Sequence, residues 1–318
     1  MHDYSTHHRG TSARPAHKKK NTGIVIASIL LFVLTLAVFF SKKTFNLNID
    51  STNTPSSIKN DALSGTSKDL QTGFMKNVDE LTSTAGGTFS VYIYDIKNNK
   101  EYGIHPQTVL TAASLNKIAI LAALYHLAGD KEIDLEKIIT LQKDDIQDYG
   151  TGSMRYDPPG TTYSIKTLAR LMMEKSDNTA SYILANQIIG VDKIQEFINT
   201  LGLTQTNMVE NETSAKDMGI LLIKMYKGEI TTSPLTSEML NFMEKTDFDD
   251  RLPTGLPSGV KIYHKTGDEI GKIHDVGIIN LPEKPYFLGV LSSDMTDENK
   301  AKNIISEISR IVFTEMKK

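Results

Sequence analysis

Residues 114–128, SLNKIAILAALYHLA, are apolar on nearly every face of a helix, and the stretch ends at Gly129. A helix that lacks a polar face has to be covered by other elements, so this stretch predicts a buried helix at the centre of a folded domain. The rest of that domain therefore has to be arranged around it.

The elements expected around this helix place strands at both ends of the domain. Alternating apolar residues predict strands over 88–96 and 101–104, joined by a turn at 97–100, and again over 260–265, 273–280 and 286–293. Helices are predicted over 70–83, 164–175, 179–189, 192–201, 214–227, 234–246 and 297–316. The expected fold class is α/β of the α+β type: an antiparallel sheet built from both ends of the domain and flanked by helices, with an all-helical insertion.

The N-terminal part of the chain differs in composition from the rest. Residues 1–22 are polar and basic, whereas 23–41 contain an uncharged apolar run, GIVIASILLFVLTLAVFF, long enough to cross a bilayer as a helix. Because basic residues are denser before this run, we expect a cytoplasmic tail, a single-pass signal anchor in a bacterial cell membrane and an extracytoplasmic domain. A cleaved signal peptide and a buried core helix are the alternatives. Residues 42–69, rich in Ser, Thr and Asn, are expected to be a disordered tether before the folded domain, 70–318.

Composition excludes several kinds of chemistry. The chain has no cysteine, so disulfides, cysteine ligation and thiol catalysis are impossible. A net charge of −3 predicts no nucleic-acid partner. Four of the eight histidines lie in residues 1–22 and no His-Glu-x-x-His motif occurs, so neither a metal nor another cofactor is expected.

Ser114 and Lys117 form the first of three polar motifs. Their spacing puts both side chains on one face at the start of the buried helix. A serine hydroxyl is a weak nucleophile until a base takes its proton, and a lysine can be that base when burial lowers its pKa. The backbone amide of Ser114 would also donate to a developing oxyanion. The alternative is an N-cap serine beside a lysine that extends to solvent.

Ser176, Asp177 and Asn178 form the second motif, between two predicted helices. In a catalytic site, Ser176 would relay a proton to the leaving nitrogen and Asn178 would bind the amide of the substrate. Asp177 would hold the turn through local hydrogen bonds. Simple capping of the following helix is the alternative explanation.

Lys265, Thr266 and Gly267 form the third motif, at the end of the strand predicted over 260–265. On a strand edge, Lys and Thr can bind a substrate carboxylate, and Gly lets another backbone approach closely. The amide of Asp268 would be a second oxyanion donor. A plain transition from strand to turn is the alternative.

The three motifs agree in their order, their separation and their placement on helix, loop and strand. Ser-x-x-Lys, Ser-Asp-Asn and Lys-Thr-Gly are together the motifs of class A β-lactamases and penicillin-binding proteins. From about residue 70 to 318 the chain resembles the class A β-lactamase-like serine hydrolases of the penicillin-recognising serine enzyme superfamily. Gly150–Met154, with Ser153, resembles the loop of that family that faces the pocket, and His274–Ile279 resembles its next strand.

The resemblance implies a serine hydrolase that forms an acyl-enzyme on Ser114, with Lys117 as the base and Ser176 as the proton relay. The implied substrate is a β-lactam or a related amide, either a small molecule or one derived from peptidoglycan. The implied substrate contacts are Asn178, Lys265, Thr266 and Gly267, with oxyanion amides from Ser114 and Asp268.

Residues 201–212 depart from the family pattern. Class A β-lactamases have here a long loop with a glutamate that activates the deacylating water, whereas this stretch leads almost directly into the next predicted helix. Glu210 or Glu212 could substitute, but both also fit solvated or helix-capping acids. We therefore expect acylation, without an identified base for hydrolysis of the acyl-enzyme. A slow β-lactamase, a peptidoglycan D,D-peptidase and a penicillin-binding sensor or interaction module that is acylated without efficient turnover remain the alternatives.

Asp268 is a second departure from the family. Its carboxylate lies beside Lys265 in the sequence and works against an anionic substrate. Lys272 or His274 is expected to supply compensating positive charge.

Overall fold

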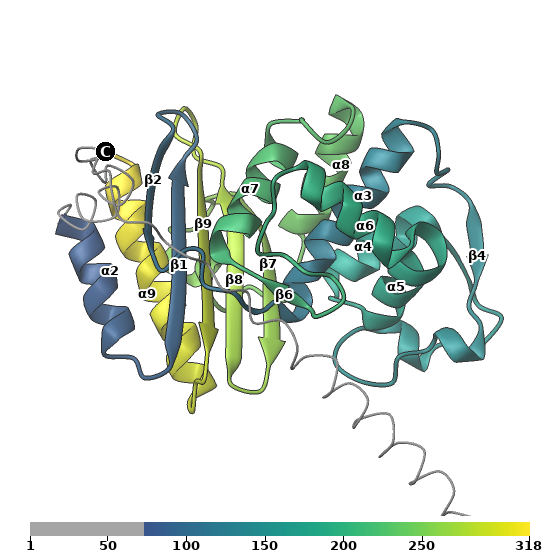
Figure 1. Cartoon of the computed structure of the whole chain (residues 1–318), viewed down its shortest axis with the longest axis horizontal. Coiled ribbons are helices and arrows are strands. Elements are labelled where there is room, and N and C mark those ends of the chain that lie inside the picture. The colour runs from purple at the N-terminus through teal and green to yellow at the C-terminus, as the bar shows by residue number, and fades with distance from the viewer. Residues whose placement is uncertain (1–72) are drawn as a thin grey trace, which may run out of the picture. The chain divides into compact units, whose positions relative to one another are not determined.

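The computed structural model describes residues 73–318 (Figure 1). The tail, the membrane anchor and the tether expected over 1–22, 23–41 and 42–69 lie outside these described residues. Within the described part, no helix combines the length and the apolar character needed to cross a membrane.

A five-stranded antiparallel sheet in the order β2-β1-β9-β8-β7 joins the two ends of the domain. β1 (Thr88–Asp95) pairs with β2 (Lys100–Ile104) on one side and with β9 (Tyr286–Ser293) on the other. β8 (Lys272–Ile279) then joins β9 to β7 (Ile262–Glu269), which is the edge strand. The predicted sheet, built from both ends of the domain, is confirmed.

Helices cover both faces of this sheet (Figure 1). α2 (Gly73–Ser83) and α9 (Glu298–Met316) bury their apolar stripes, among them Met75 and Ile305, in one core with the strands. α7 (Ala215–Tyr226) contacts β1, β8 and β9 on the opposite face. Burying such stripes against the strands is what stabilises a layered α/β fold.

The helical insertion packs around α3 (Asn116–Gly129), as predicted. Nine consecutive residues of this helix, 117–125, are buried, so no face of this stretch is exposed to solvent. The elements around it are α4 (Ile165–Glu174), α5 (Asn178–Tyr182) continued by a π-helix (Ile183–Ile189), α6 (Val191–Thr200) and α8 (Ser233–Glu244). Two small sheets complete this part: β3 (Leu110–Thr111) with β6 (Glu212–Thr213), and β4 (Ile138–Thr140) with β5 (Thr162–Ser164).

Two elements that carry the polar motifs differ from the predictions. The helix expected from residue 114 begins as a 3₁₀ turn, Ala113–Leu115, and becomes α-helical at Asn116. The strand expected to end at residue 265 continues to Glu269, because each of its last residues pairs with β8 across the hairpin. The Lys-Thr-Gly motif therefore lies inside a paired strand. The alternation of apolar residues stops before this motif, so the sequence pattern does not reveal that the pairing continues.

Candidate active site

The three motifs meet at one cleft. A cavity of about 890 Å³ is lined by Ser114 in the 3₁₀ turn before α3, Lys117 at the start of α3, Asn178 at the start of α5 and Asp268 on β7. A smaller recess of about 80 Å³ opens beside it. Ser114, Asn178 and Asp268 line both the recess and the cleft, whereas Ser176 and Thr266 line the recess alone.

Lys117 is the buried amine at the centre of the site. Its side chain is 3% exposed, and Nζ lies 3.0 Å from Ser114 Oγ and 3.2 Å from Ser176 Oγ. Nζ also lies 2.7 Å from both the Ser176 carbonyl oxygen and Asn178 Oδ1. Burial, with the positive charge of Lys265 as a second cause, lowers the pKa of Lys117 well below its usual range, against the opposing charge of Asp177. A neutral Lys117 can accept the proton of Ser114.

Ser176 lies between the two lysines of the site. Its Oγ is 3.0 Å from Lys265 Nζ as well as 3.2 Å from Lys117 Nζ. The backbone of Ser176 has a φ of +51°, a conformation that costs a non-glycine residue energy. Its carbonyl oxygen, which accepts from Lys117 Nζ and from Thr151 Oγ1 at 2.8 Å, holds this conformation in place. The hydroxyl is thereby aimed at both amines.

Asp177 fastens the second motif to the loop before it. One carboxylate oxygen accepts from the Ala180 amide and caps α5, while the other accepts from the Met154 amide, both at 2.9 Å. A Cβ at Gly152 would lie 2.6 Å from the Asp177 Cα, so this loop requires a glycine there. The capping explanation is therefore correct for Asp177 and is compatible with a functional motif.

The loop over 149–154 borders the site, but not through Ser153, the residue that the sequence analysis names in this loop. Tyr149, Gly150 and Thr151 line the two cavities, whereas Ser153 lines neither. Thr151, through its bond to the Ser176 carbonyl, supports the site in a way that the sequence pattern did not indicate.

Thr266 lines the recess, and Lys265 lies behind it, with its Nζ 3.0 Å from Ser176 Oγ; both residues have almost no exposed surface. Burial lowers the pKa of Lys265 to about 7; the negative charges of Asp268 and Asp275 oppose this, and the charge of Arg251 adds to it. Lys265 Nζ also donates to its neighbour's carbonyl oxygen, 2.8 Å away. Lys265 is therefore an amine with a lowered pKa, buried beneath the Ser176 hydroxyl that lines the recess.

Gly267 lets β7 approach the turn that carries the nucleophile. A Cβ at this position would lie 3.0 Å from His274 Cδ2, 3.1 Å from the Ala112 carbonyl oxygen and 3.3 Å from Leu115 Cγ. The backbone that Gly267 allows to approach is thus that of the 3₁₀ turn that contains Ser114.

Arg251, which the sequence motifs did not indicate, supplies the positive charge beside Asp268. Its guanidinium forms an ion pair with Asp268 and donates to the His274 carbonyl oxygen at 2.8 Å, although the residue is only 1% exposed. The expectation for Lys272 and His274 is wrong. Lys272 pairs with Glu269. Burial lowers the pKa of the His274 imidazole to about 4, so it is neutral.

A second ionic group lies behind the third motif. His264 Nδ1 lies 2.9 Å from Asp275 Oδ1, and Nε2 lies 3.1 Å from Asp249 Oδ1. Burial alone would lower its pKa, but the charges and hydrogen bonds of the two carboxylates raise the pKa of His264 to about 9. The carboxylates lie at opposite ring nitrogens, and among residues 73–318 no set of three or more His, Cys, Asp or Glu side chains is arranged to bind a metal.

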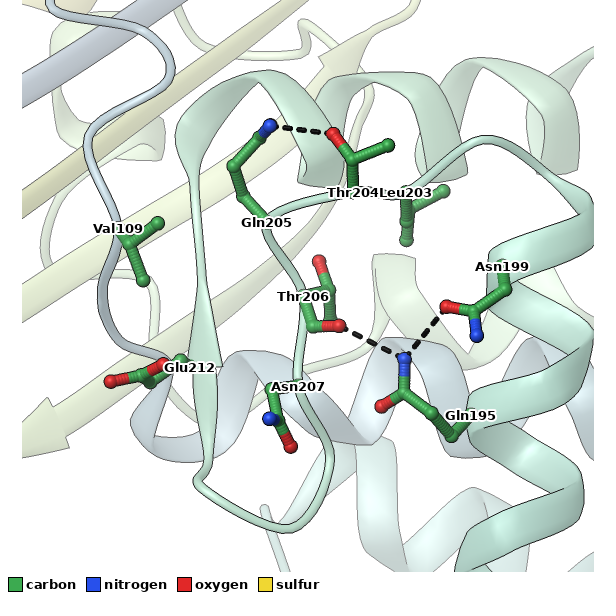
Figure 2. A pocket seen from close by; sticks show the side chains of 9 residues that line it. All are labelled: Val109, Gln195, Asn199, Leu203, Thr204, Gln205, Thr206, Asn207 and Glu212. Carbon is green, nitrogen blue, oxygen red and sulfur yellow. Dashed lines mark hydrogen bonds between the residues drawn. The ribbon is translucent and has the colours of Figure 1, made fainter. Parts of the chain in front are cut away.

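The loop over 204–211 borders the cleft, but neither Glu210 nor Glu212, the two candidate acids for deacylation, lines it. Met208, Val209 and Asn211 line the cleft. Glu212 lines a separate pocket of about 480 Å³ instead (Figure 2), and Glu210 lines neither cavity. The structure therefore does not bring these two acids to Ser114.

Gln195 of α6 fixes the path of this loop. Its Nε2 donates to the Thr206 carbonyl oxygen at 3.0 Å, as Figure 2 shows, and its Oε1 accepts from the Met208 amide at 2.8 Å. At the other end of the loop, the Asn211 carbonyl oxygen accepts from the Ala112 amide at 2.7 Å. These bonds hold Met208, Val209 and Asn211, rather than a carboxylate of this loop, at the cleft that Ser114 also lines.

Comparison with known proteins agrees with this geometry. The model of the Beta-lactamase enzyme family matches residues 73–316. Beta-lactamase ROB-1 of Haemophilus influenzae is 23% identical over 261 residues, which cover 76% of this chain and 84% of that protein. The beta-lactamase of Bacillus subtilis (strain 168) is 24% identical, covering 93% of this chain and 96% of that protein.

Solved structures give the same result. The structure of PBP-A has a TM-score of 0.73 and 26% identity, covering 78% of this chain and 97% of that one. A PBP-A mutant solved as an acyl-enzyme complex with penicillin G has a TM-score of 0.72, again with 26% identity. Since the family model spans almost all of the described residues and the three motifs meet in one cleft, the chain belongs to the beta-lactamase enzyme family and is a serine β-lactamase-like hydrolase.

Proposed function

We propose that this protein forms an acyl-enzyme on Ser114 with a β-lactam or a related amide. The observation that carries the proposal is the contact between Lys117 Nζ, buried and with a lowered pKa, and Ser114 Oγ at 3.0 Å. An amine with these properties is a competent general base for a serine nucleophile at neutral pH.

The proposed acylation includes three proton transfers. Lys117 takes the Ser114 proton as Oγ attacks the carbonyl carbon, and the amides of Ser114 and Asp268 would stabilise the resulting oxyanion. The carbon–nitrogen bond then breaks. Ser176 gives its proton to the leaving nitrogen and recovers one from Lys117, 3.2 Å away.

We further propose that release of the acyl group is slow. The loop over 204–211 presents Met208, Val209 and Asn211 to the cleft, and none of these can deprotonate a water molecule. Three acids do border the cleft, Asp192, Asp268 and Glu269, but they lie at the start of α6 and on β7 rather than on this loop. This favours a penicillin-binding protein or sensor over an efficient β-lactamase.

Intact-mass measurement of the full chain with benzylpenicillin tests both statements. We expect a stable adduct of one penicillin mass, absent in Ser114→Ala, with little hydrolysed product over many minutes. Rapid product formation would refute slow release and establish a β-lactamase. If neither an adduct nor a hydrolysed product forms, penicillin recognition is refuted. Release of D-alanine from a peptide ending in D-Ala-D-Ala would identify a D,D-peptidase.

The uncharged run within 23–41 supports a further part of the proposal, a membrane-tethered protein whose catalytic domain lies outside the cytoplasm. The chain should then stay in the membrane fraction after extraction with alkaline carbonate. Its appearance in the soluble fraction would contradict a membrane anchor.

A further inference from the structure

We propose that Asp268 determines the substrate specificity of this cleft: its carboxylate disfavours acyl donors that carry a carboxylate beside the scissile amide. Donors that are neutral or cationic at that position are favoured. The inference rests on the proposed acylation of Ser114 and adds the charge of the preferred substrate.

The position of Asp268 gives it influence over any bound substrate. Ser114 and Asp268 both border the large cleft and the recess. A substrate with its carbonyl at Ser114 and a substituent in the recess therefore passes the Asp268 side chain. Thr266 and Ser176, whose hydroxyl groups can donate to a substrate carboxylate, line the same recess.

The charge of Asp268 is held in place and faces the cavity. Arg251 binds Oδ1, while Oδ2 has no hydrogen-bond partner in the part of the chain that the structure describes. The Asp268 side chain is 45% exposed, whereas that of Arg251 is 2% exposed. A substrate thus meets the carboxylate and not the guanidinium behind it.

Lys265, which lies behind the recess, compensates only in part for the charge of Asp268. Lys265 is buried under Ser176 and donates to its hydroxyl at 3.0 Å. A substrate carboxylate at the recess then meets the fixed charge of Asp268, whereas the Lys265 amine lies beneath the Ser176 hydroxyl. Like charges a few ångströms apart repel each other. Removing the Asp268 charge should raise the rate of acylation by an anionic substrate on the order of tenfold. This change corresponds to about 1.4 kcal/mol.

Two probes that differ only in this charge test the inference: benzylpenicillin and its methyl ester. With the full chain, we expect Asp268→Asn to raise the second-order rate of acylation by the free acid about tenfold and to change the rate with the ester less than twofold. Glu269→Gln is the matched control. It removes the same charge one residue along β7, from a side chain that pairs with Lys272 and borders the large cleft but not the recess. We expect it to leave the ratio of the acid rate to the ester rate within twofold.

Equal changes for acid and ester, or an equal change of the ratio in Glu269→Gln, would overturn the inference while leaving the proposed function intact. Absence of an adduct with either probe in the wild-type protein would overturn the proposed function itself. If Asp268→Asn does not fold, the wild-type protein gives the answer with a third probe, the cationic 2-(dimethylamino)ethyl ester. This ester should acylate Ser114 at least threefold faster than the methyl ester, and a slower reaction would overturn the inference.

Discussion

Replacing His264 tests whether a buried ion pair stabilises the strand that carries Lys265. His264 is 1% exposed and lies between Asp275, which is fully buried, and Asp249. His264→Gln keeps a hydrogen-bond donor of similar size but removes the group that can be protonated. The variant therefore separates the charge of the imidazolium from its packing.

The magnitude follows from the pKa of His264, which the two carboxylates raise from 6.5 to about 9. Because the folded state binds this proton more tightly than the unfolded state, the contribution to stability is complete below pH 6.5 and is lost as the pH rises through 9. At 1.36 kcal/mol per pKa unit, this amounts to about 3 kcal/mol. The free energy of unfolding of the wild type, minus that of His264→Gln, should therefore fall by about 3 kcal/mol between pH 6 and pH 10.

Urea unfolding followed by circular dichroism measures this difference at each pH. Circular dichroism suits the chain because it contains no tryptophan. Groups common to both proteins, Lys265 among them, largely cancel in the difference. Asp249→Asn, which removes one of the two partners, should give a smaller pH-dependent loss than the wild type. If the wild type and His264→Gln show parallel stability curves over this range, His264 is neutral in the folded protein and the reasoning fails.

Two further substitutions test the catalytic geometry. Lys117→Arg keeps a positive charge that cannot be removed near neutral pH, so acylation by benzylpenicillin should fall by about 10²–10⁴-fold in a mass-spectrometric time course; an unchanged rate would contradict the role of Lys117 as the base. Gly267→Ala places a Cβ 3.1 Å from the Ala112 carbonyl oxygen. It should lower the free energy of unfolding by about 1–3 kcal/mol and slow acylation, because β7 has to move away from the turn that carries Ser114. Wild-type stability and rate in this variant would show that the contact is not tight.

Local patterns in the sequence were sufficient for the elements and for contacts within them. An apolar stretch without a polar face predicted the buried α3, and its first turn brings Ser114 and Lys117 together because residues three apart share a face. Alternation predicted the strands of the main sheet, and their placement at both ends of the domain predicted how it is assembled.

Contacts between distant segments were decided only by the tertiary structure. Nothing near Arg251 in the sequence indicates that its guanidinium reaches Asp268, since β7 and the residues before it are brought together by packing. The placement of Glu212 in a separate pocket is also a tertiary effect. It depends on the hydrogen bonds that hold the loop over 204–211 to α6 and to Ala112, just before α3. Spacing along a helix or strand fixes which side chains share a face, but the charge that a substrate meets depends on which segments pack against that face.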